Sequence, residues 1–207
     1  EASLDPVDLV IVPGGFSFGD YLRCGALAGR APIMNAVMDH AARGGAVLGV
    51  CNGFQVLTET GMLPGALIRN AGLRFCCRMI RLETCATMKS PFTTGLSVGQ
   101  SLDIPVAHNE GNYFADDDTL SKLKTNDQIL FQYSSPDGEI TDLSNPNGSL
   151  LNIAGICNER RNVCGMMPHP ERASESVLGE EDGVKIFEGM TLHFQGAPRR
   201  TEQDSVA

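Results

Sequence analysis

Short apolar runs and helical repeats alternate along the first third of the chain. Two β-branched apolar runs, at residues 7–12 (VDLVIV) and 46–50 (AVLGV), predict buried strands because glycine or proline bounds them. Residues 31–45 place apolar side chains at helical spacing, with proline early and two glycines at the end. A second helix is expected from about residue 52 to residue 60. Strand, helix, strand, helix is typical of a parallel sheet covered by helices.

The pattern after residue 72 changes to shorter β-type segments. Antiparallel strands are predicted at 74–83, 101–108 and 128–135. A further pair of strands is predicted at 153–159 and 162–167, before a last helix at 181–194. We therefore expect an α/β fold with an open, mostly parallel sheet, flanking helices and an added antiparallel portion.

The domain organisation is expected to be simple. The chain has 207 residues and no internal repeat or linker, which predicts one domain over residues 1–195. Residues 196–207 are polar, and we expect a disordered tail there.

Composition and charge exclude several classes of function. Hydrophobic residues make up 42% of the chain, and no apolar run approaches the roughly 20 residues of a membrane helix. The net charge is −9, and Lys and Arg form no extended cluster, which argues against binding nucleic acid. The start of the chain has no basic segment followed by an apolar core, so no secretory signal is predicted.

Seven cysteines, an odd number, show no C-x-x-C spacing. This usage fits reduced thiols and predicts a cytoplasmic protein without a metal site. Free cysteines are most often small buried hydrophobic residues, and we read six of the seven in this way.

Cys51 differs from the other cysteines in its position. It follows the run at 46–50 within Gly49-Val50-Cys51-Asn52-Gly53, which has the form of a nucleophile elbow between a strand and a helix. The backbone N–H groups that open the helix would lower the pKa of a nearby thiol. Cys51 is therefore the candidate nucleophile.

A thiol nucleophile needs a base, and the chain has four histidines. We read His40 and His193 as surface or helix-end residues. His169 lies between two prolines, so we expect extended backbone that points His169 and Glu171 the same way. Glu171 would then orient the imidazole towards Cys51.

Two alternatives to this Cys-His-Glu relay remain open from spacing alone. Glu171 could pair with Arg172 or Arg160 instead of the imidazole. His108 is a second, weaker candidate for the base.

The loop at residues 13–16 offers a place for negative charge. Its glycines allow backbone N–H groups of the loop to face an oxyanion, together with the N–H of Asn52. The loop lacks the Lys-Ser/Thr of a P-loop and the G-x-G-x-x-G spacing. With an elbow cysteine, the pattern favours acyl transfer.

These motifs together resemble the class I, or triad, glutamine amidotransferases, which have a flavodoxin-like fold. Within that family, the chain is most similar to the glutaminase subunits of phosphoribosylformylglycinamidine synthase. The segments that carry the resemblance are PGGFS (13–17), CNGFQ (51–55), IPVAHNEGNYFAD (104–116) and HPE (169–171).

The resemblance implies a role for each matching residue. Cys51 would attack the side-chain amide of glutamine, His169 would carry the proton and Glu171 would orient His169. Gly15, Phe16 and Asn52 would contact the oxyanion. The residues implied to hold glutamine are Gln55, Glu110 and Gly111.

The resemblance also implies partners. Ammonia would pass to a large synthetase subunit, which binds ATP and Mg, and a small accessory subunit is expected as well. No cofactor is expected in this chain. The alternatives are a triad amidotransferase that serves another synthetase and an inactive homologue.

The chain departs from the pattern of this family in two ways. Asn109 and Asn112 stand where glycine and arginine are usual. The family also has a strand and a helix before the position of Glu1. We therefore expect the segment to be poorly stable alone unless another piece completes the sheet.

Overall fold

The computed structural model describes residues 3–15 and 24–196. The helices are α1 (Cys24–Ala28), α2 (Pro32–Ala42), α3 (Asn52–Glu59), α4 (Asp117–Thr125) and α5 (Asp182–Gln195). The strands are β1 (Leu9–Val12), β2 (Ala46–Val50), β3 (Ala66–Ile68), β4 (Cys76–Thr84), β5 (Ser101–His108), β6 (Asn112–Phe114), β7 (Ile129–Ser134), β8 (Ile153–Cys157) and β9 (Val163–Met166). The expected tail, from residue 197 on, lies outside the described residues.

The described residues form a seven-stranded sheet in the order β1-β2-β9-β8-β7-β4-β5. β1, β2 and β9 are parallel, with Leu9 opposite Ala46 and Val47 opposite Val163. Parallel strands end at the same edge of a sheet, so the residues that follow β1, β2 and β9 meet there. This edge carries Gly14, Cys51 and His169.

Both portions of the expected sheet are present, but the antiparallel portion is larger than expected. β8 and β9 form a hairpin, and β7, β4 and β5 continue antiparallel beyond it. Parallel pairing is confined to β1, β2 and β9. The change of direction follows from the tight turn at residues 158–162, which cannot make the crossover that parallel strands need.

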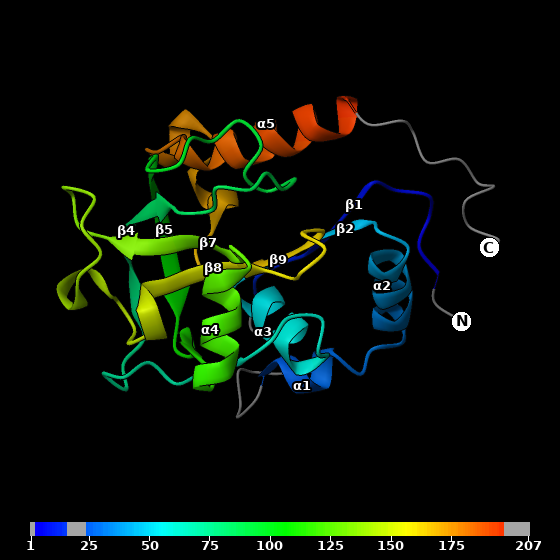
Figure 1. Cartoon of the computed structure of the whole chain (residues 1–207), viewed down its shortest axis with the longest axis horizontal. Coiled ribbons are helices and arrows are strands. Elements are labelled where there is room, and N and C mark those ends of the chain that lie inside the picture. The colour runs from blue at the N-terminus through cyan, green and yellow to red at the C-terminus, as the bar shows by residue number, and fades with distance from the viewer. Residues whose placement is uncertain (1–2, 16–23, 197–207) are drawn as a thin grey trace.

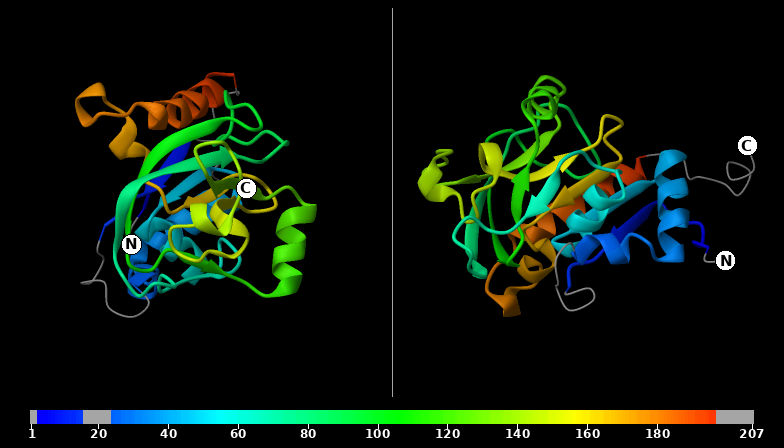
Figure 2. Two further views of the ribbon diagram at one scale, coloured as in Figure 1. Left: turned by 90° about the vertical axis from the view of Figure 1, so that its left-hand side faces the viewer. Right: turned by 90° about the horizontal axis from the view of Figure 1, so that it is seen from below.

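Helices lie on both sides of the sheet (Figure 1). In that view, α5 runs along the top, while α1, α3 and α4 lie below the strands. The view from below in Figure 2 shows the short α1 beside α3, with α2 at the end of the sheet near β1 and β2. Because helices cover both faces of the sheet, every residue of β2 is buried, as its uninterrupted apolar run predicts.

The contact between α3 and the sheet depends on close packing at one glycine. A Cβ on Gly165 of β9 would lie 2.1 Å from the ring of Phe54, which is fully buried. On its other side, Phe54 stacks on Tyr113, with ring centroids 6.0 Å apart. The amino-terminal half of α3 is thereby held between β9 and the segment that follows β5.

Four helices and strands among the described residues were not predicted from the sequence. They are α1, α4 and the small antiparallel pair of β3 and β6, with Leu67 opposite Tyr113. The pair contains only three residues on each side, too few for a period-two pattern to stand out. No helix in the described part of the chain is long and apolar enough to cross a membrane.

Candidate active site

Cys51 occupies a strained turn between β2 and α3. Its backbone has φ 50° and ψ −106°, outside the regions that side chains other than glycine favour. The turn is possible because glycines flank it. A Cβ on Gly53 would lie 1.9 Å from the carbonyl oxygen of Val12, and one on Gly49 would lie 2.6 Å from Leu57. This is the geometry of a nucleophile elbow, as the sequence predicts.

The thiol of Cys51 is buried at the edge of the sheet. Sγ donates a weak hydrogen bond to the carbonyl oxygen of Ala107 at 3.7 Å. Ala107 lies near the end of β5, far from the elbow in sequence. The end of β5 therefore forms one wall around the candidate nucleophile.

The other described thiols have different surroundings: Cys157 and Cys164 are buried and Cys76 and Cys85 are half-buried, but Cys77 is exposed, so the expectation of a buried residue was wrong for Cys77. Burial raises the pKa of Cys85 to about 12 and that of Cys157 to about 11. Burial also raises the pKa of Cys164. A raised pKa keeps a thiol protonated and unreactive at neutral pH, as expected for structural cysteines.

His169 and Glu171 form a hydrogen-bonded pair after β9. Nδ1 of His169 lies 2.6 Å from Oε1 of Glu171. The backbone between them is a turn of 3-10 helix, Pro170–Ala173, closed by Arg172 N donating to His169 O. The expectation of extended backbone was therefore wrong. Pro170 fits the first turn of a helix because its missing N–H and its fixed φ suit that position.

Cys51 and His169 approach the same point from different strands. A Cβ on Gly14, just after β1, would lie 3.4 Å from Cβ of Cys51 and 2.7 Å from Cε1 of His169. Nε2 of His169 is buried and has no hydrogen bond partner among the described residues. Since Nδ1 is held by Glu171, Nε2 is the ring nitrogen that remains for a proton transfer.

The electrostatics of Glu171 favour its carboxylate form. Burial raises the pKa of Glu171, but the hydrogen bond from His169 and its positive charge outweigh burial, so the net shift is downward. Arg172 is a weaker neighbour, with Nε 3.9 Å from Oε1. Arg160 donates to the carbonyl oxygen of Ala42 instead. Of the three partners considered for Glu171, namely His169, Arg172 and Arg160, His169 is the one within hydrogen-bonding distance.

The other three histidines are engaged elsewhere. His108 is buried with Nδ1 at 3.1 Å from Asn70 and Nε2 at 3.4 Å from Asn147, so neither ring nitrogen is left for Cys51. His40 lies in the last turn of α2, as expected of a helix-end residue, but it is buried against the Ala46 carbonyl and is not at the surface. His193 is half-buried in α5, next to Thr94.

The expected glutamine-binding residues gather beside the elbow. Gln55 links Glu110 to Asn52, because its Nε2 donates to the Glu110 carbonyl at 2.8 Å and its Oε1 accepts from Asn52 at 2.7 Å. Gly111 follows in the same turn after β5. The side-chain amide of Gln55 thus joins the elbow helix to the 107–111 turn.

The oxyanion residues are described in part. Gly15 extends from β1 with φ 158°, directly after Gly14. Asn52 is the first residue of α3, where backbone N–H groups point out of the helix. Phe16 lies outside the described residues.

Sequence reasoning missed the residues that support the turn at 107–111. These are Asn70, Asn147 and Tyr133, all buried. Asn147 falls in the segment NPNGS (145–149), whose composition predicts only a turn. No local pattern connects residues 70, 109 and 147, since folding alone brings them together.

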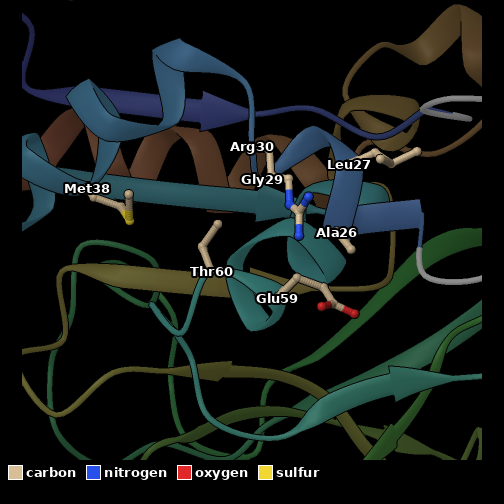
Figure 3. Close-up of a pocket in the computed structure, with 7 residues that line it drawn as sticks. All are labelled: Ala26, Leu27, Gly29, Arg30, Met38, Glu59 and Thr60. Atoms are coloured by element: carbon tan, nitrogen blue, oxygen red, sulfur yellow. The ribbon is translucent and has the colours of Figure 1, made fainter.

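A separate hollow lies between α1, α2 and α3 (Figure 3). Its volume is about 610 Å³, and it is lined by Ala26, Leu27, Gly29, Arg30, Met38, Glu59 and Thr60. Glu59 and Thr60 are at the carboxyl end of α3, whereas Cys51 precedes its amino end. No three His, Cys, Asp or Glu side chains in the described part of the chain gather as a metal site requires.

The fold and the elbow cysteine define a class of protein, and comparison with known families agrees. The family described as the CobB/CobQ-like glutamine amidotransferase domain matches residues 1–188, so the chain belongs to this family.

More particular relatives carry the name phosphoribosylformylglycinamidine synthase subunit PurQ. The protein of that name from Koribacter versatilis is 57% identical over 187 residues, which cover 90% of this chain and 80% of the relative. The one from Salinibacter ruber is 56% identical over 195 residues, covering 93% and 82%. A chain in the structure of PurLQS from Thermotoga maritima matches with a TM-score of 0.81 and 39% identity, covering 94% of this chain and 83% of that one.

Proposed function

We propose that this chain is the glutaminase subunit of a phosphoribosylformylglycinamidine synthase. In this function it hydrolyses L-glutamine to glutamate and supplies ammonia for purine biosynthesis. The identity of more than half to relatives named for this subunit supports the proposal over most of the chain.

The observation that supports the mechanism is that Cys51 and His169 both lie next to Gly14. A Cβ added at Gly14 would lie 3.4 Å from Cβ of Cys51 and 2.7 Å from Cε1 of His169, and Nδ1 of the same imidazole lies 2.6 Å from Oε1 of Glu171. A nucleophile, a base and an orienting carboxylate are thus aligned at one edge of the sheet. The same three roles, nucleophile, base and orienting carboxylate, make up the serine triad.

The first half of the reaction forms a thioester. His169 takes the proton of the Cys51 thiol through Nε2, and Sγ attacks the side-chain carbonyl carbon of glutamine. The tetrahedral intermediate carries its negative charge on oxygen, which the N–H groups at Gly15, Phe16 and Asn52 stabilise. His169 returns the proton to the amide nitrogen, the C–N bond breaks and ammonia leaves.

The second half releases glutamate. His169 removes a proton from water, and the resulting hydroxide attacks the thioester carbon. The C–S bond breaks, and Sγ recovers its proton from His169. Glu171 stays ionised and holds Nδ1–H throughout. Gln55 supports the pocket through Asn52 and Glu110, next to Gly111.

The partners follow from the same proposal. Ammonia passes to a large synthetase subunit, which binds ATP and Mg, and a small accessory subunit completes the complex. The chain itself uses no cofactor in this reaction. The structure of PurLQS from Thermotoga maritima, which contains a chain similar to this one, supports an assembly of this kind. We place the enzyme in the cytoplasm, with residues 1–195 as its amidotransferase domain.

The proposal is tested by measuring glutamate and ammonia from glutamine, with and without the synthetase subunit. We expect hydrolysis by the full protein and faster hydrolysis in the complex with the synthetase. Glutamine that remains intact under both conditions would overturn the proposed function. With hydroxylamine in place of water, γ-glutamyl hydroxamate should form, because the thioester can be attacked by either nucleophile.

A further inference from the structure

Two buried asparagines from distant loops hold the turn at 107–111. Asn70 follows β3, and Asn147 lies in the loop before β8. Each is almost completely buried, with an exposed fraction of 2%. A buried amide needs partners for all its polar atoms, so the contacts of these two residues define their role.

Asn70 uses the full hydrogen-bonding capacity of its side chain. Oδ1 accepts from Gly111 N at 3.0 Å and faces Nδ1 of His108 at 3.1 Å. Nδ2 donates to the carbonyl oxygens of His108 at 3.0 Å and Arg74 at 2.8 Å. A backbone N–H can only donate and a carbonyl can only accept, so the orientation of the Asn70 amide is fixed.

Asn147 meets the turn from the other side. Its Nδ2 donates to the Gly111 carbonyl at 2.8 Å and to the hydroxyl oxygen of Tyr133 at 3.2 Å. The same Nδ2 lies 3.4 Å from Nε2 of His108, and Oδ1 accepts from Ser149 N at 3.0 Å. The N–H of Gly111 is therefore bound by Asn70, and its carbonyl is bound by Asn147 together with the Ser149 hydroxyl at 3.1 Å.

The two asparagines also determine the tautomer of His108. Asn70 presents an acceptor to Nδ1, which must donate, while the amide nitrogen of Asn147 beside Nε2 offers no acceptor for a second ring proton. His108 is thus held as a neutral ring with its proton on Nδ1. Burial, followed by the positive charge of His169, lowers the pKa of His108 to about 4, in agreement with this assignment.

The turn held in this way contacts the candidate active site at two points. The Ala107 carbonyl accepts from Sγ of Cys51, and the Glu110 carbonyl accepts from Nε2 of Gln55. Gly111 is so close to the His108 ring that a Cβ there would lie 2.5 Å from Nδ1. A change in the asparagines would therefore move this wall of the pocket, whereas Cys51 and His169 are held in the turns that follow β2 and β9.

We propose that Asn70 and Asn147 are positioning residues for glutamine binding, which hold His108 and Gly111 from two sides and so set the 107–111 wall against the elbow. This inference rests on the proposed function, because glutamine is the substrate whose binding they control. Neither residue touches the reacting atoms in this account. Their effect is exerted through the turn.

The test compares Asn70→Asp with the unchanged protein in the complex with the synthetase. The substitution keeps the shape but places a second oxygen against the carbonyls of His108 and Arg74, which loses two hydrogen bonds and adds repulsion. We expect the KM for glutamine to rise by about tenfold or more, with kcat changed by less than about threefold. Alkylation of Cys51 by iodoacetamide should keep its rate.

The matched control is Asn162→Asp. Asn162 is also buried, and its Nδ2 donates to two carbonyls, those of Ala41 at 2.8 Å and Gly45 at 2.7 Å. It precedes β9, at the opposite edge of the sheet from Cys51. We expect Asn162→Asp to lose stability as Asn70→Asp does, but to keep the KM for glutamine of the unchanged protein.

The outcomes separate this inference from the proposed function. If the unchanged protein hydrolyses glutamine and Asn70→Asp keeps its KM or loses only kcat, the positioning role is overturned while the function stands. Should Asn70→Asp fail to fold by circular dichroism, Asn147→Asp is measured in its place, and its KM is expected to rise as well. If neither Asn70→Asp nor Asn147→Asp folds while Asn162→Asp does, then Asn70 and Asn147 serve stability alone, and the proposal is overturned.

Discussion

Nδ1 of His169 lies 2.6 Å from Oε1 of Glu171 within one turn of 3-10 helix. The imidazole is buried, while the carboxylate side chain is about half exposed. The same turn is tied to β5, since His169 N donates to the Pro105 carbonyl at 2.8 Å. The ring is therefore held both by its own backbone and by Glu171, and Nε2 is left buried without a hydrogen bond partner among the described residues.

Replacing Glu171 by Gln should reduce glutamine hydrolysis strongly. The amide cannot stabilise an imidazolium, and its NH₂ group can face Nδ1 and favour the wrong tautomer, so we expect kcat to fall on the order of 10²-fold or more. Steady-state kinetics with glutamine measure the effect. Glu175→Gln, at an exposed position four residues on, is the control and should keep its rate. Equal rates for both variants would remove Glu171 from the mechanism.

A methyl group on Gly53 should destabilise the elbow. The Cβ would lie 1.9 Å from the Val12 carbonyl, so β1 or α3 must move, at a cost of about 2 to 3 kcal/mol in the free energy of unfolding. Gly72→Ala is the matched control, because a Cβ at that position would meet nothing within 4 Å. Urea unfolding of both variants tests this contact, and equal midpoints would contradict it.

The stability of the protein should depend on pH through His108. Burial, followed by the charge of His169, lowers the pKa of His108 to about 4, whereas the unfolded chain has the ordinary value of about 6.5. Between these values the unfolded state binds the extra proton, so the contribution is complete above about pH 6.5 and is lost as the pH falls to about 4.

The loss attributed to His108 amounts to about 3 kcal/mol. Urea unfolding at pH 7.5 and pH 4 should therefore show a larger decrease for the unchanged protein than for His108→Gln, which keeps an acceptor for Asn147. The difference between the two proteins removes the contribution of other titrating groups. Parallel decreases would show that His108 is protonated in the folded state.

The elements near Cys51 were predictable because their signals are local. The apolar run of β2, the glycines at 49 and 53 and the stop at Gly61 are all read within twenty residues of sequence. These signals predict a strand, a tight turn and a helix, which the structure confirms. The strain at Cys51 follows from the same short segment.

The surroundings of the elbow could not be predicted because they depend on contacts between distant segments. Nothing in the sequence near Asn70 or Asn147 indicates that both reach Gly111. The 3-10 turn after His169 was missed because we treated the two flanking prolines as a signal for extended backbone, although proline also suits the first turn of a helix. The larger antiparallel part of the sheet likewise depends on which strands become neighbours, and spacing does not determine that.

The central claim is that Cys51 is the nucleophile of a glutaminase, and Cys51→Ala tests it most directly. Glutamine hydrolysis is measured for the unchanged protein, for Cys51→Ala and for the controls Cys77→Ser and Cys157→Ser, each in complex with the synthetase. We expect loss of activity on the order of 10³-fold or more in Cys51→Ala, and rates close to the unchanged protein in both controls. Equal glutamine hydrolysis by Cys51→Ala and the unchanged protein would contradict the account.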